Sequence, residues 1–258
     1  MGSSSDCNGS RFHTLCAQPF VFCPIFFRVS FALPNGKTLL VYFIRGTTHA
    51  VAVSLWFFAL SRIPITEVIA IGYTVPIYVS VGAALFLGEK LTLNRLVTVI
   101  VGFVGAMIIL RPGIRSIDSG TMAQMVAAIV FAGSFLMAKR LSDRENPVMI
   151  VAMLSVFASI ALLPGAIMQW KTPSLTELFW LGVIALLATF GNFAQIKAFQ
   201  VAPITVTQPV WFLRLVWAAI LGWLVFDEII DPFVLGGGAI IILAVAYTSY
   251  REAQFPSV

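Results

Sequence analysis

The sequence predicts an all-α integral membrane protein, a multi-span helical bundle of two inverted-topology repeats with the first repeat incomplete. Three observations lead to this fold class. Of the 258 residues, 59% are hydrophobic and only 10% are charged, whereas soluble domains average about 25% charged residues. The apolar residues, which give a mean hydropathy of +0.96, gather in runs long enough to cross a bilayer. Some residues also recur at one fixed spacing along the chain, which predicts the repeats.

Eight apolar runs predict transmembrane helices, because a spanning helix needs about 20 predominantly apolar residues. The runs are too long and too uniformly apolar for the strands of a lipid-facing barrel, and helices satisfy the backbone within each segment. A ninth candidate, residues 15–34, is weaker because Pro19, Pro24 and Arg28 interrupt it. The eight spans in chain order are residues 43–61, 66–88, 94–111, 120–140, 148–168, 176–198, 204–226 and 233–250.

Short connections separate these runs, and they carry the residues that end helices. Proline removes a backbone donor, and glycine relaxes the backbone, so both favour a turn at these points. The connections hold Arg62-Ile63-Pro64, Gly88-Glu89-Lys90, Arg111-Pro112-Gly113, Asn146-Pro147, Lys171-Thr172-Pro173, Ala202-Pro203 and Asp231-Pro232.

A shift of 139 residues aligns two parts of the chain without a gap. The offset contains five predicted spans, an odd number, so the two copies have opposite orientations in the membrane. Inverted repeats are the architecture of secondary transporters, in which one half moves against the other about a central site. The shift pairs Ala59 with Ala198, Pro64 with Pro203, Ile65 with Ile204, Thr66 with Thr205, Leu85 with Leu224 and Glu89 with Glu228. We expect an N-terminal segment at 1–42, an incomplete first repeat at 43–113 and a second repeat at 120–250.

Lysine and arginine predict the orientation, because they accumulate on the cytoplasmic side of membrane proteins. With residues 1–42 in the cytoplasm, and counting the connections from Lys37 onward, nine basic residues face inside and four face outside. This distribution places the C-terminus in the cytoplasm. The inside residues are Lys37, Arg45, Lys90, Arg95, Lys139, Arg140, Arg144, Lys197 and Arg251, and the outside residues are Arg62, Arg111, Arg115 and Lys171.

The composition and the motifs exclude several classes of function. The net charge of +5 comes from basic residues that punctuate apolar runs, which is not the pattern of a nucleic-acid-binding face. The three cysteines, Cys7, Cys16 and Cys23, have no zinc or redox spacing. The sequence holds no nucleotide-binding P-loop, no HExxH and no Gly-x-Ser-x-Gly motif. We therefore predict no enzyme activity, no metal, no cofactor and no nucleic-acid partner.

Two stretches carry a resemblance to a known family. The first is Arg45-Gly46 followed by residues 57–113, with LFLGEKLT at 85–92 and GFVGAMIILRPG at 102–113. The second is AFQVAPITVTQPVWFLRLVWAAILGWLVFDE at 198–228. With these motifs the chain resembles the EamA type of the drug/metabolite transporter superfamily. The resemblance implies ten helices in two inverted repeats, cytoplasmic termini and transport of small metabolites. The sequence departs from this pattern at its start: residues 1–14 are polar, so we expect no counterpart of the family's first helix.

Arg214 is the main candidate for a substrate-binding residue. It lies about ten residues from either end of the predicted span 204–226, near the bilayer midplane, where a charge costs about 2.5–3.5 kcal/mol on insertion scales. Gln208 and Trp211 precede it at spacings of three, so the three side chains can line one side of a helix. Arginine binds a carboxylate or phosphate bidentately, and tryptophan offers a stacking face. The alternative is a structural ion pair with a carboxylate on another helix.

Further substrate-binding candidates are aromatic and amide side chains inside predicted spans. Tyr73 and Tyr78 share the second span, and Trp56 lies on the span before it. These rings either line a substrate path or pack against other helices. Asn192 and Gln195 are three residues apart on the sixth span, where their amides need partners. They either contact substrate or hydrogen-bond between helices.

Four residues are candidates for coupling or gating. Glu67 begins the second span, and protonation of a membrane carboxylate can couple transport to a proton gradient. The alternative is a carboxylate that stabilises the start of its helix. His49 titrates near neutral pH when it is unperturbed, with packing as the alternative. Pro76 and Pro209 remove backbone hydrogen bonds and so break or bend their helices close to the candidate site.

We expect a secondary transporter that moves a small organic metabolite with an anionic group across the bacterial inner membrane by alternating access. The expected partners are this small molecule and the lipid bilayer, with protons as a candidate coupling ion and a homodimer as a candidate assembly. The alternative function is a non-transporting or degenerate membrane protein of the same family, truncated at its N-terminus. Substrate flux in proteoliposomes distinguishes the two.

Overall fold

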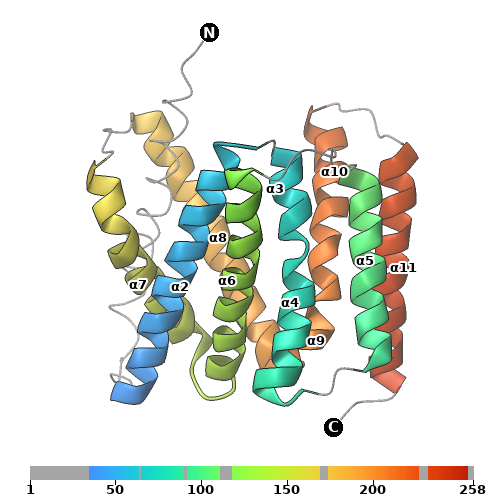
Figure 1. Cartoon of the computed structure of the whole chain (residues 1–258), viewed down its shortest axis with the longest axis horizontal. Helices are drawn as coiled ribbons and strands as arrows, with labels where there is room; N and C mark the ends of the chain where they lie inside the picture. The colour runs from blue at the N-terminus through green and yellow to red at the C-terminus, as the bar shows by residue number, and fades with distance from the viewer. Residues whose placement is uncertain are drawn as a thin grey trace. The chain divides into compact units, whose positions relative to one another are not determined.

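The computed structural model describes residues 35–63, 65–89, 92–110, 118–168, 174–226 and 232–254 (Figure 1). Every regular element in these ranges is a helix. Six of the described helical segments are long and apolar enough to cross a membrane, and two more are shorter apolar helices. This part of the chain therefore confirms the all-α, multi-span fold class. The predicted ninth span, the three cysteines and Glu228 lie outside the described residues.

The described helices follow the eight predicted spans in order and differ from them mainly at their ends. The largest extension is at the start of α2, which begins at Gly36 and not at 43, because residues 39–42 (LLVY) continue the apolar run and the helix also includes Gly36, Lys37 and Thr38. The elements are α2 (Gly36–Leu60), α3 (Ile65–Gly72), α4 (Val75–Gly82), η1 (Ala83–Leu87), α5 (Leu93–Leu110), α6 (Ser119–Ser142), α7 (Pro147–Met168), α8 (Leu175–Val201), α9 (Ile204–Thr207), η2 (Pro209–Phe212), α10 (Leu213–Phe226) and α11 (Pro232–Gln254).

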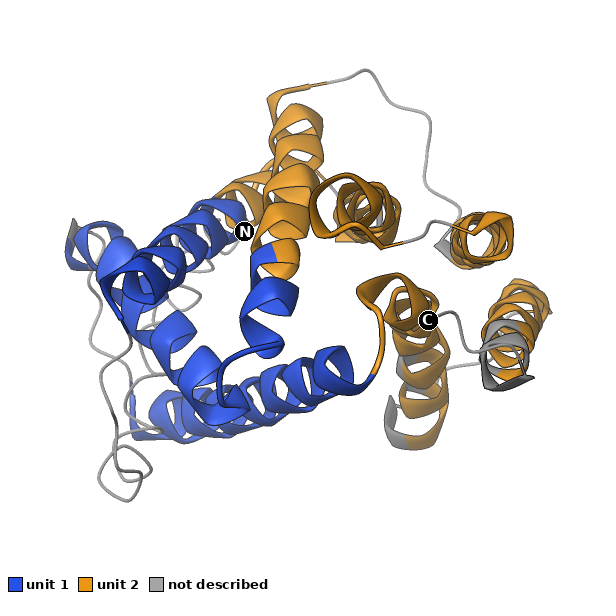
Figure 2. Ribbon diagram, turned by 90° about the horizontal axis from the view of Figure 1, so that it is seen from below, with its two compact units in different colours: residues 1–54, 137–201 blue, residues 55–136, 202–258 orange. Residues whose placement is uncertain are grey.

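The chain divides into two compact units, which are described separately (Figure 2). Among the described residues, unit 1 holds the first part of α2, the end of α6, and α7 and α8. Unit 2 holds the rest of α2 and α6 together with α3, α4, η1, α5 and the elements from α9 to α11. Most candidates for substrate binding lie in unit 2, so the packing of this unit matters most for function.

In unit 1, α2 meets α7 at a point where the two backbones come close. A Cβ added at Gly46 would lie 2.4 Å from the Cβ of Phe157, so a larger residue does not fit there. The neighbouring Arg45 is buried and donates a hydrogen bond from Nη1 to the carbonyl oxygen of Ile150 at 3.1 Å. The Arg-Gly pair that contributed to the family resemblance therefore joins two helices.

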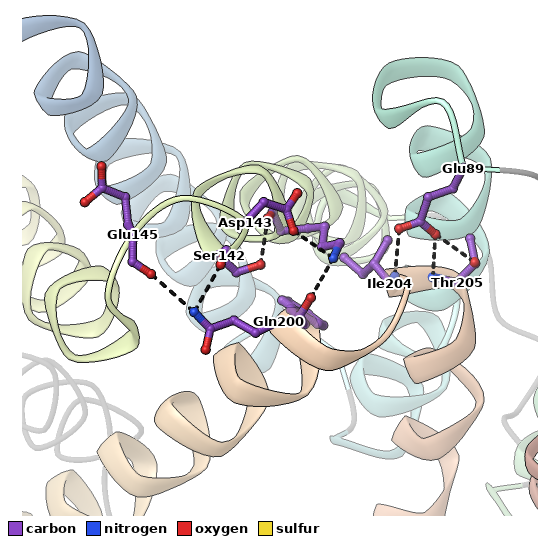
Figure 3. A network of polar contacts seen from close by, with 9 residues as sticks. Glu89, Ser142, Asp143, Glu145, Gln200, Ile204 and Thr205 are labelled. Carbon is purple, nitrogen blue, oxygen red and sulfur yellow. Dashed lines mark hydrogen bonds and ion pairs between the residues drawn. The ribbon is translucent and has the colours of Figure 1, made fainter. Parts of the chain in front are cut away.

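The ends of α6 and α8 in unit 1 are joined by side chains that bind backbone carbonyl groups. Lys139 donates to the carbonyl oxygen of Phe199 at 2.6 Å. Gln200 Nε2 donates to the carbonyl oxygens of Ser142 at 3.1 Å and Glu145 at 3.3 Å (Figure 3). The last carbonyl groups of a helix lack partners within that helix, so these contacts satisfy them and fix both helix ends.

The second and seventh predicted spans are interrupted in unit 2. In the second span, a turn at Tyr73 and Thr74 separates α3 from α4, which begins at Val75 with Pro76 as its second residue and continues into η1. The seventh is divided into α9, η2 and α10, with Pro209 as the first residue of η2. Proline is tolerated in the first turn of a helix because no backbone donor is needed there. The interruptions expected near the two prolines are therefore confirmed, whereas their role in gating stays a prediction.

The two interrupted segments have the same layout along the chain. α3 begins at Ile65 and α9 begins at Ile204, which are positions that the 139-residue shift pairs. The turn at Tyr73 corresponds in the same way to Phe212, the last residue of η2. The repeat seen in the sequence is thus also a repeat of local structure.

α5 and α11 pack against each other in unit 2 through glycines (Figure 1). A Cβ added at Gly237 would lie 2.6 Å from the carbonyl oxygen of Gly105, and one added at Gly105 would lie 3.0 Å from the carbonyl oxygen of Gly237. Small residues allow this direct backbone contact between membrane helices. One turn away, the ring of Phe212 packs on Gly102, which brings η2 against α5.

Candidate functional site

Two aromatic rings meet where the two interrupted segments come together in unit 2. The rings of Tyr73 and Phe212 are stacked, with centroids 5.4 Å apart and an interplanar angle of 17°. Both side chains are buried in a core with Val99, Leu215 and Ile241. Because the 139-residue shift pairs Tyr73 with Phe212, the breaks of the two copies contact each other through equivalent residues.

Arg214 lies beside this aromatic pair, in the first turn of α10. Its guanidinium carbon is 4.4 Å from the ring centroid of Trp211 and 5.8 Å from that of Tyr73. Both distances are within the range of cation–π interactions. Because Tyr73 is buried and Arg214 contacts its ring, the arginine side chain is directed toward the aromatic core of unit 2. The Arg214 side chain is nevertheless exposed in part, so it retains surface for a ligand.

Trp211 also contacts a residue that the sequence did not indicate. Phe135 on α6 contacts Trp211 edge to face, with ring centroids 4.9 Å apart. Phe135 is buried, so it limits the positions that the indole can adopt. The structure therefore gathers Tyr73, Trp211, Arg214 and Phe135 from three segments of unit 2. A phenylalanine in an apolar run carries no sequence signal that separates it from ordinary core residues.

Gln208, predicted to line the substrate site, uses part of its side-chain amide within its own segment. Its Nε2 donates to the carbonyl oxygen of Ile204 at 3.3 Å, and the side chain is buried. Its Oε1 has no hydrogen-bond partner among the residues that the structure describes. The amide nitrogen thus bonds to a carbonyl group of its own interrupted helix, and the amide oxygen is an acceptor that a ligand or water can use.

A second glutamine in unit 2, Gln124 on α6, was not among the sequence candidates. Its Nε2 donates to the carbonyl oxygen of Val68 at 3.0 Å, and the side chain is buried. This nitrogen also lies 3.5 Å from the position of a Cβ built at Gly72, next to Tyr73. An amide within the apolar run 120–140 is a visible signal, so sequence reasoning could have included it.

The remaining aromatic candidates of unit 2 lie elsewhere in the unit. Trp56 packs against the cluster of Ala59, Ile63 and Val68, and its ring is 4.9 Å from that of Phe57. Trp56 therefore packs against other side chains, which is the alternative to lining a substrate path. Tyr78 is half-buried on α4, five residues after the break at Tyr73. Whether either contacts substrate stays a prediction.

The two amide candidates on α8 belong to unit 1. Asn192 donates to the carbonyl oxygen of Ala188 on its own helix at 3.0 Å. Gln195 Nε2 is buried and has no hydrogen-bond partner among the described residues. Asn192 thus satisfies its amide locally, while Gln195 keeps an unused donor.

The candidates for coupling are also divided between the units. Glu67 is buried in the first turn of α3, in unit 2, which is the location expected for a carboxylate that stabilises a helix start. His49 is half-buried on α2 in unit 1, four residues after Arg45. A role of either residue in proton coupling stays a prediction. Among the described residues, no three His, Cys, Asp or Glu side chains are grouped as metal ligands would be.

The comparisons with known proteins agree with this architecture. The family model of the EamA-like transporter family matches residues 11–111 and 118–250. The first match thus begins ahead of residue 43, where the sequence analysis begins the first repeat. A solved crystal structure shares the fold with a TM-score of 0.67 at 14% sequence identity, and the match covers 97% of this chain and 99% of that one.

Curated relatives cover most of this chain. An S-adenosylmethionine uptake transporter of Rickettsia bellii is 30% identical, over 95% of this chain and 87% of the relative. A riboflavin transporter of Brucella anthropi is 33% identical, over 83% of this chain and 77% of the relative. A riboflavin transporter of Vibrio cholerae is 31% identical, over 83% of this chain and 72% of the relative. The chain therefore belongs to the EamA-like transporter family, and it is a membrane transporter of small metabolites and not an enzyme.

Proposed function

We propose that this transporter moves a small metabolite that carries a flat aromatic ring system and an anionic group, and that Arg214, Trp211 and Tyr73 form part of its binding site. The observation that carries the proposal is the position of the Arg214 guanidinium, 4.4 Å from the Trp211 ring and 5.8 Å from the Tyr73 ring. A charge in a membrane-spanning segment is expensive and therefore points to function. Transport proceeds by alternating access across the bacterial inner membrane.

The chemistry of this cluster defines the ligand class. A guanidinium binds a carboxylate bidentately, and the faces of Trp211 and Tyr73 can stack on a planar ring. The relatives are named for S-adenosylmethionine and riboflavin. Both compounds contain a fused heteroaromatic ring system, and S-adenosylmethionine also has a carboxylate. We therefore take S-adenosylmethionine as the first substrate to test. Riboflavin, which has no anionic group, tests the ring system without the partner for Arg214.

The finer features of the transport cycle are part of the same proposal. Glu67 and His49 are the candidate groups for proton coupling, and Pro76 and Pro209 are the candidate sites of helix movement. Gln208 in unit 2 and Gln195 in unit 1 each have a buried amide atom without a partner among the described residues. Such atoms can bind polar groups of the substrate, which supports a substrate with such groups. A homodimer is the proposed assembly.

The test is uptake of labelled S-adenosylmethionine and of labelled riboflavin into proteoliposomes that contain the full chain. We expect uptake of S-adenosylmethionine, and Arg214→Ala should reduce it by about tenfold or more, because it removes a charged hydrogen-bonding group. Uptake of riboflavin alone would contradict the anionic group in the proposal. Arg62→Ala is the matched control. Arg62 also lies over an aromatic ring, 5.1 Å from the centroid of Phe58, but in a turn outside the spans.

The possible results separate the alternatives. Uptake that survives Arg214→Ala, or that falls equally in Arg62→Ala, contradicts the proposed site. Uptake of neither compound by a monodisperse protein contradicts the proposed substrate class, and a wider screen without flux favours the non-transporting alternative.

A further inference from the structure

The carboxylate of Glu89 binds the start of α9, a helix that is distant from it in sequence. Oε1 of Glu89 accepts a hydrogen bond from the backbone N–H of Ile204 at 2.8 Å. Oε2 accepts one from the backbone N–H of Thr205 at 3.1 Å and one from the Thr205 hydroxyl at 2.8 Å (Figure 3). One carboxylate therefore satisfies three donors at a single helix start.

The local backbone places Glu89 for this contact. The π-helix η1 ends at Gly88, which has a φ of +71°, in the left-handed region that glycine adopts without strain. The N–H of Glu89 then bonds back to the carbonyl oxygen of Ala83 at 3.2 Å. This turn ends η1 and fixes where the Glu89 side chain begins. π-Helical turns are frequent at functional sites.

The start of α9 depends on a partner from outside the helix. Its N-cap residue is Pro203, which provides no side-chain cap. Unbonded N–H groups at a helix start in an apolar region are costly. Glu89 supplies the acceptors that a serine or aspartate would normally supply at the N-cap. The negative charge also suits the positive end of the helix dipole.

A third residue completes the contact. Arg95 on α5 is buried, and its Nη1 donates to the hydroxyl oxygen of Thr205 at 3.1 Å. The Thr205 hydroxyl thus accepts from a cation and donates to an anion. Hydrogen bonds to charged groups are about twice as strong as neutral ones. Glu89, Thr205 and Arg95 therefore join the end of η1, the start of α9 and α5 within unit 2, and we name these three residues the Glu89 latch.

The latch controls the segment that carries the candidate site. After Thr205 the chain runs through the short elements α9 and η2 directly to Trp211 and Arg214. No long helix separates the anchored end from these two residues, so a shift at Thr205 is transmitted to them. Discontinuous helices of this kind form the substrate sites of many membrane transporters.

We infer that the Glu89 latch is a positioning device of the transport cycle: it holds Trp211 and Arg214 in place while closed, and its release opens this end of unit 2. Under the orientation expected from lysine and arginine, this is the cytoplasmic end. The inference rests on the proposed function only for the roles of Trp211 and Arg214. The contact itself stands on the hydrogen bonds.

The first measurement is cysteine labelling at the start of α9, which requires no knowledge of the substrate. Ile204→Cys is placed in the full chain after replacement of Cys7, Cys16 and Cys23 by serine. Ile204 is fully buried, and the bond to Glu89 uses its backbone N–H, which the substitution retains. We expect slow reaction with N-ethylmaleimide in this background. Glu89→Gln and Thr205→Val should each accelerate labelling by about tenfold, the effect of losing a hydrogen bond to a charged group.

The second measurement separates positioning from general stability. Thr205→Ser keeps the hydroxyl and should label as slowly as the parent, whereas Thr205→Val keeps the volume and loses the hydroxyl. In proteoliposomes, Glu89→Gln should raise the KM for the transported compound by several-fold, because the site is less often assembled. Combining Glu89→Gln with Thr205→Val should add little to either single change, since both open the same latch.

Glu177→Gln is the matched control. Glu177 also binds a helix start, accepting hydrogen bonds from the N–H and the hydroxyl of Ser174 at 2.8 and 2.9 Å, but these belong to its own helix α8 in unit 1. It should change neither labelling at 204 nor KM. Unchanged labelling in monodisperse Glu89→Gln and Thr205→Val overturns the inference, as does fast labelling in Thr205→Ser. If the parent protein takes up no test compound, the proposed substrate class fails and the labelling result still decides the latch.

Discussion

At the scale of the residue, Arg214 shows how a membrane protein accommodates a charge. The guanidinium lies over Trp211 and near Tyr73, and cation–π contacts contribute about 0.5–2 kcal/mol depending on desolvation. That range is smaller than the insertion cost of about 2.5–3.5 kcal/mol for arginine at the centre of a span. The aromatic rings therefore offset part of the cost. The guanidinium donors that are not engaged by the Tyr73 side chain remain for a ligand.

Trp211 provides the prediction at this scale. Tryptophan is the best cation–π partner and phenylalanine a weaker one, so transport efficiency should fall in the order wild type, Trp211→Phe, Trp211→Leu. With up to about 2 kcal/mol at stake, Trp211→Leu should lower Vmax/KM by up to about 30-fold. Initial uptake rates in proteoliposomes measure this ratio.

Trp180→Leu is the control for the tryptophan series. Trp180 is exposed on α8 and contacts Phe179 edge to face, with ring centroids 5.6 Å apart. It should leave Vmax/KM near the wild-type value. Equal losses in Trp180→Leu and Trp211→Leu would show that aromatic packing in general, and not the contact with Arg214, is being measured.

At the scale of the element, helix pairs in unit 2 are set by the positions of glycine. Gly105 on α5 and Gly237 on α11 place two backbones in direct contact, whereas a Cβ added at the adjacent Gly236 has nothing within 4 Å. Position 237 therefore requires glycine, whereas position 236 has room for a larger side chain. This difference depends on which side of α11 faces α5, and that follows from the packing of unit 2.

Gly237→Ala should consequently destabilise the protein, and Gly236→Ala should not. The added methyl group at position 237 would lie 2.5 Å from Ile109 Cγ1 and 2.6 Å from the Gly105 carbonyl oxygen. Overpacking of this kind costs about 1–3 kcal/mol. The midpoint of thermal unfolding in detergent should fall by several degrees for Gly237→Ala, and it should stay equal or rise slightly for Gly236→Ala. A fall of the same size in both variants would contradict the α5–α11 contact.

At the scale of the whole molecule, hydropathy and local sequence signals predicted the helices and their interruptions, but they did not predict the long-range contacts. The apolar runs predicted the helices, Pro76 and Pro209 predicted the interruptions, and the spacing of Arg214 from Trp211 predicted that the two can lie on one side of a helix. Phe135 and the binding of α9 by Glu89 were not predicted. Each depends on residues more than 70 positions apart in sequence meeting in space, which periodicity does not encode.

The orientation of the chain is a further property of the whole molecule, and the basic residues predict it. Nine face inside and four outside when the C-terminus is cytoplasmic, a bias that sets topology in membrane proteins. In a cysteine-free background, Arg144→Cys should react with a membrane-impermeant maleimide only after the cells are opened, and Ser61→Cys should react in intact cells. Both positions are exposed in turns between helices. The reverse pattern would invert the topology and place the Glu89 latch at the periplasmic end, and labelling of both positions in intact cells would indicate insertion in two orientations.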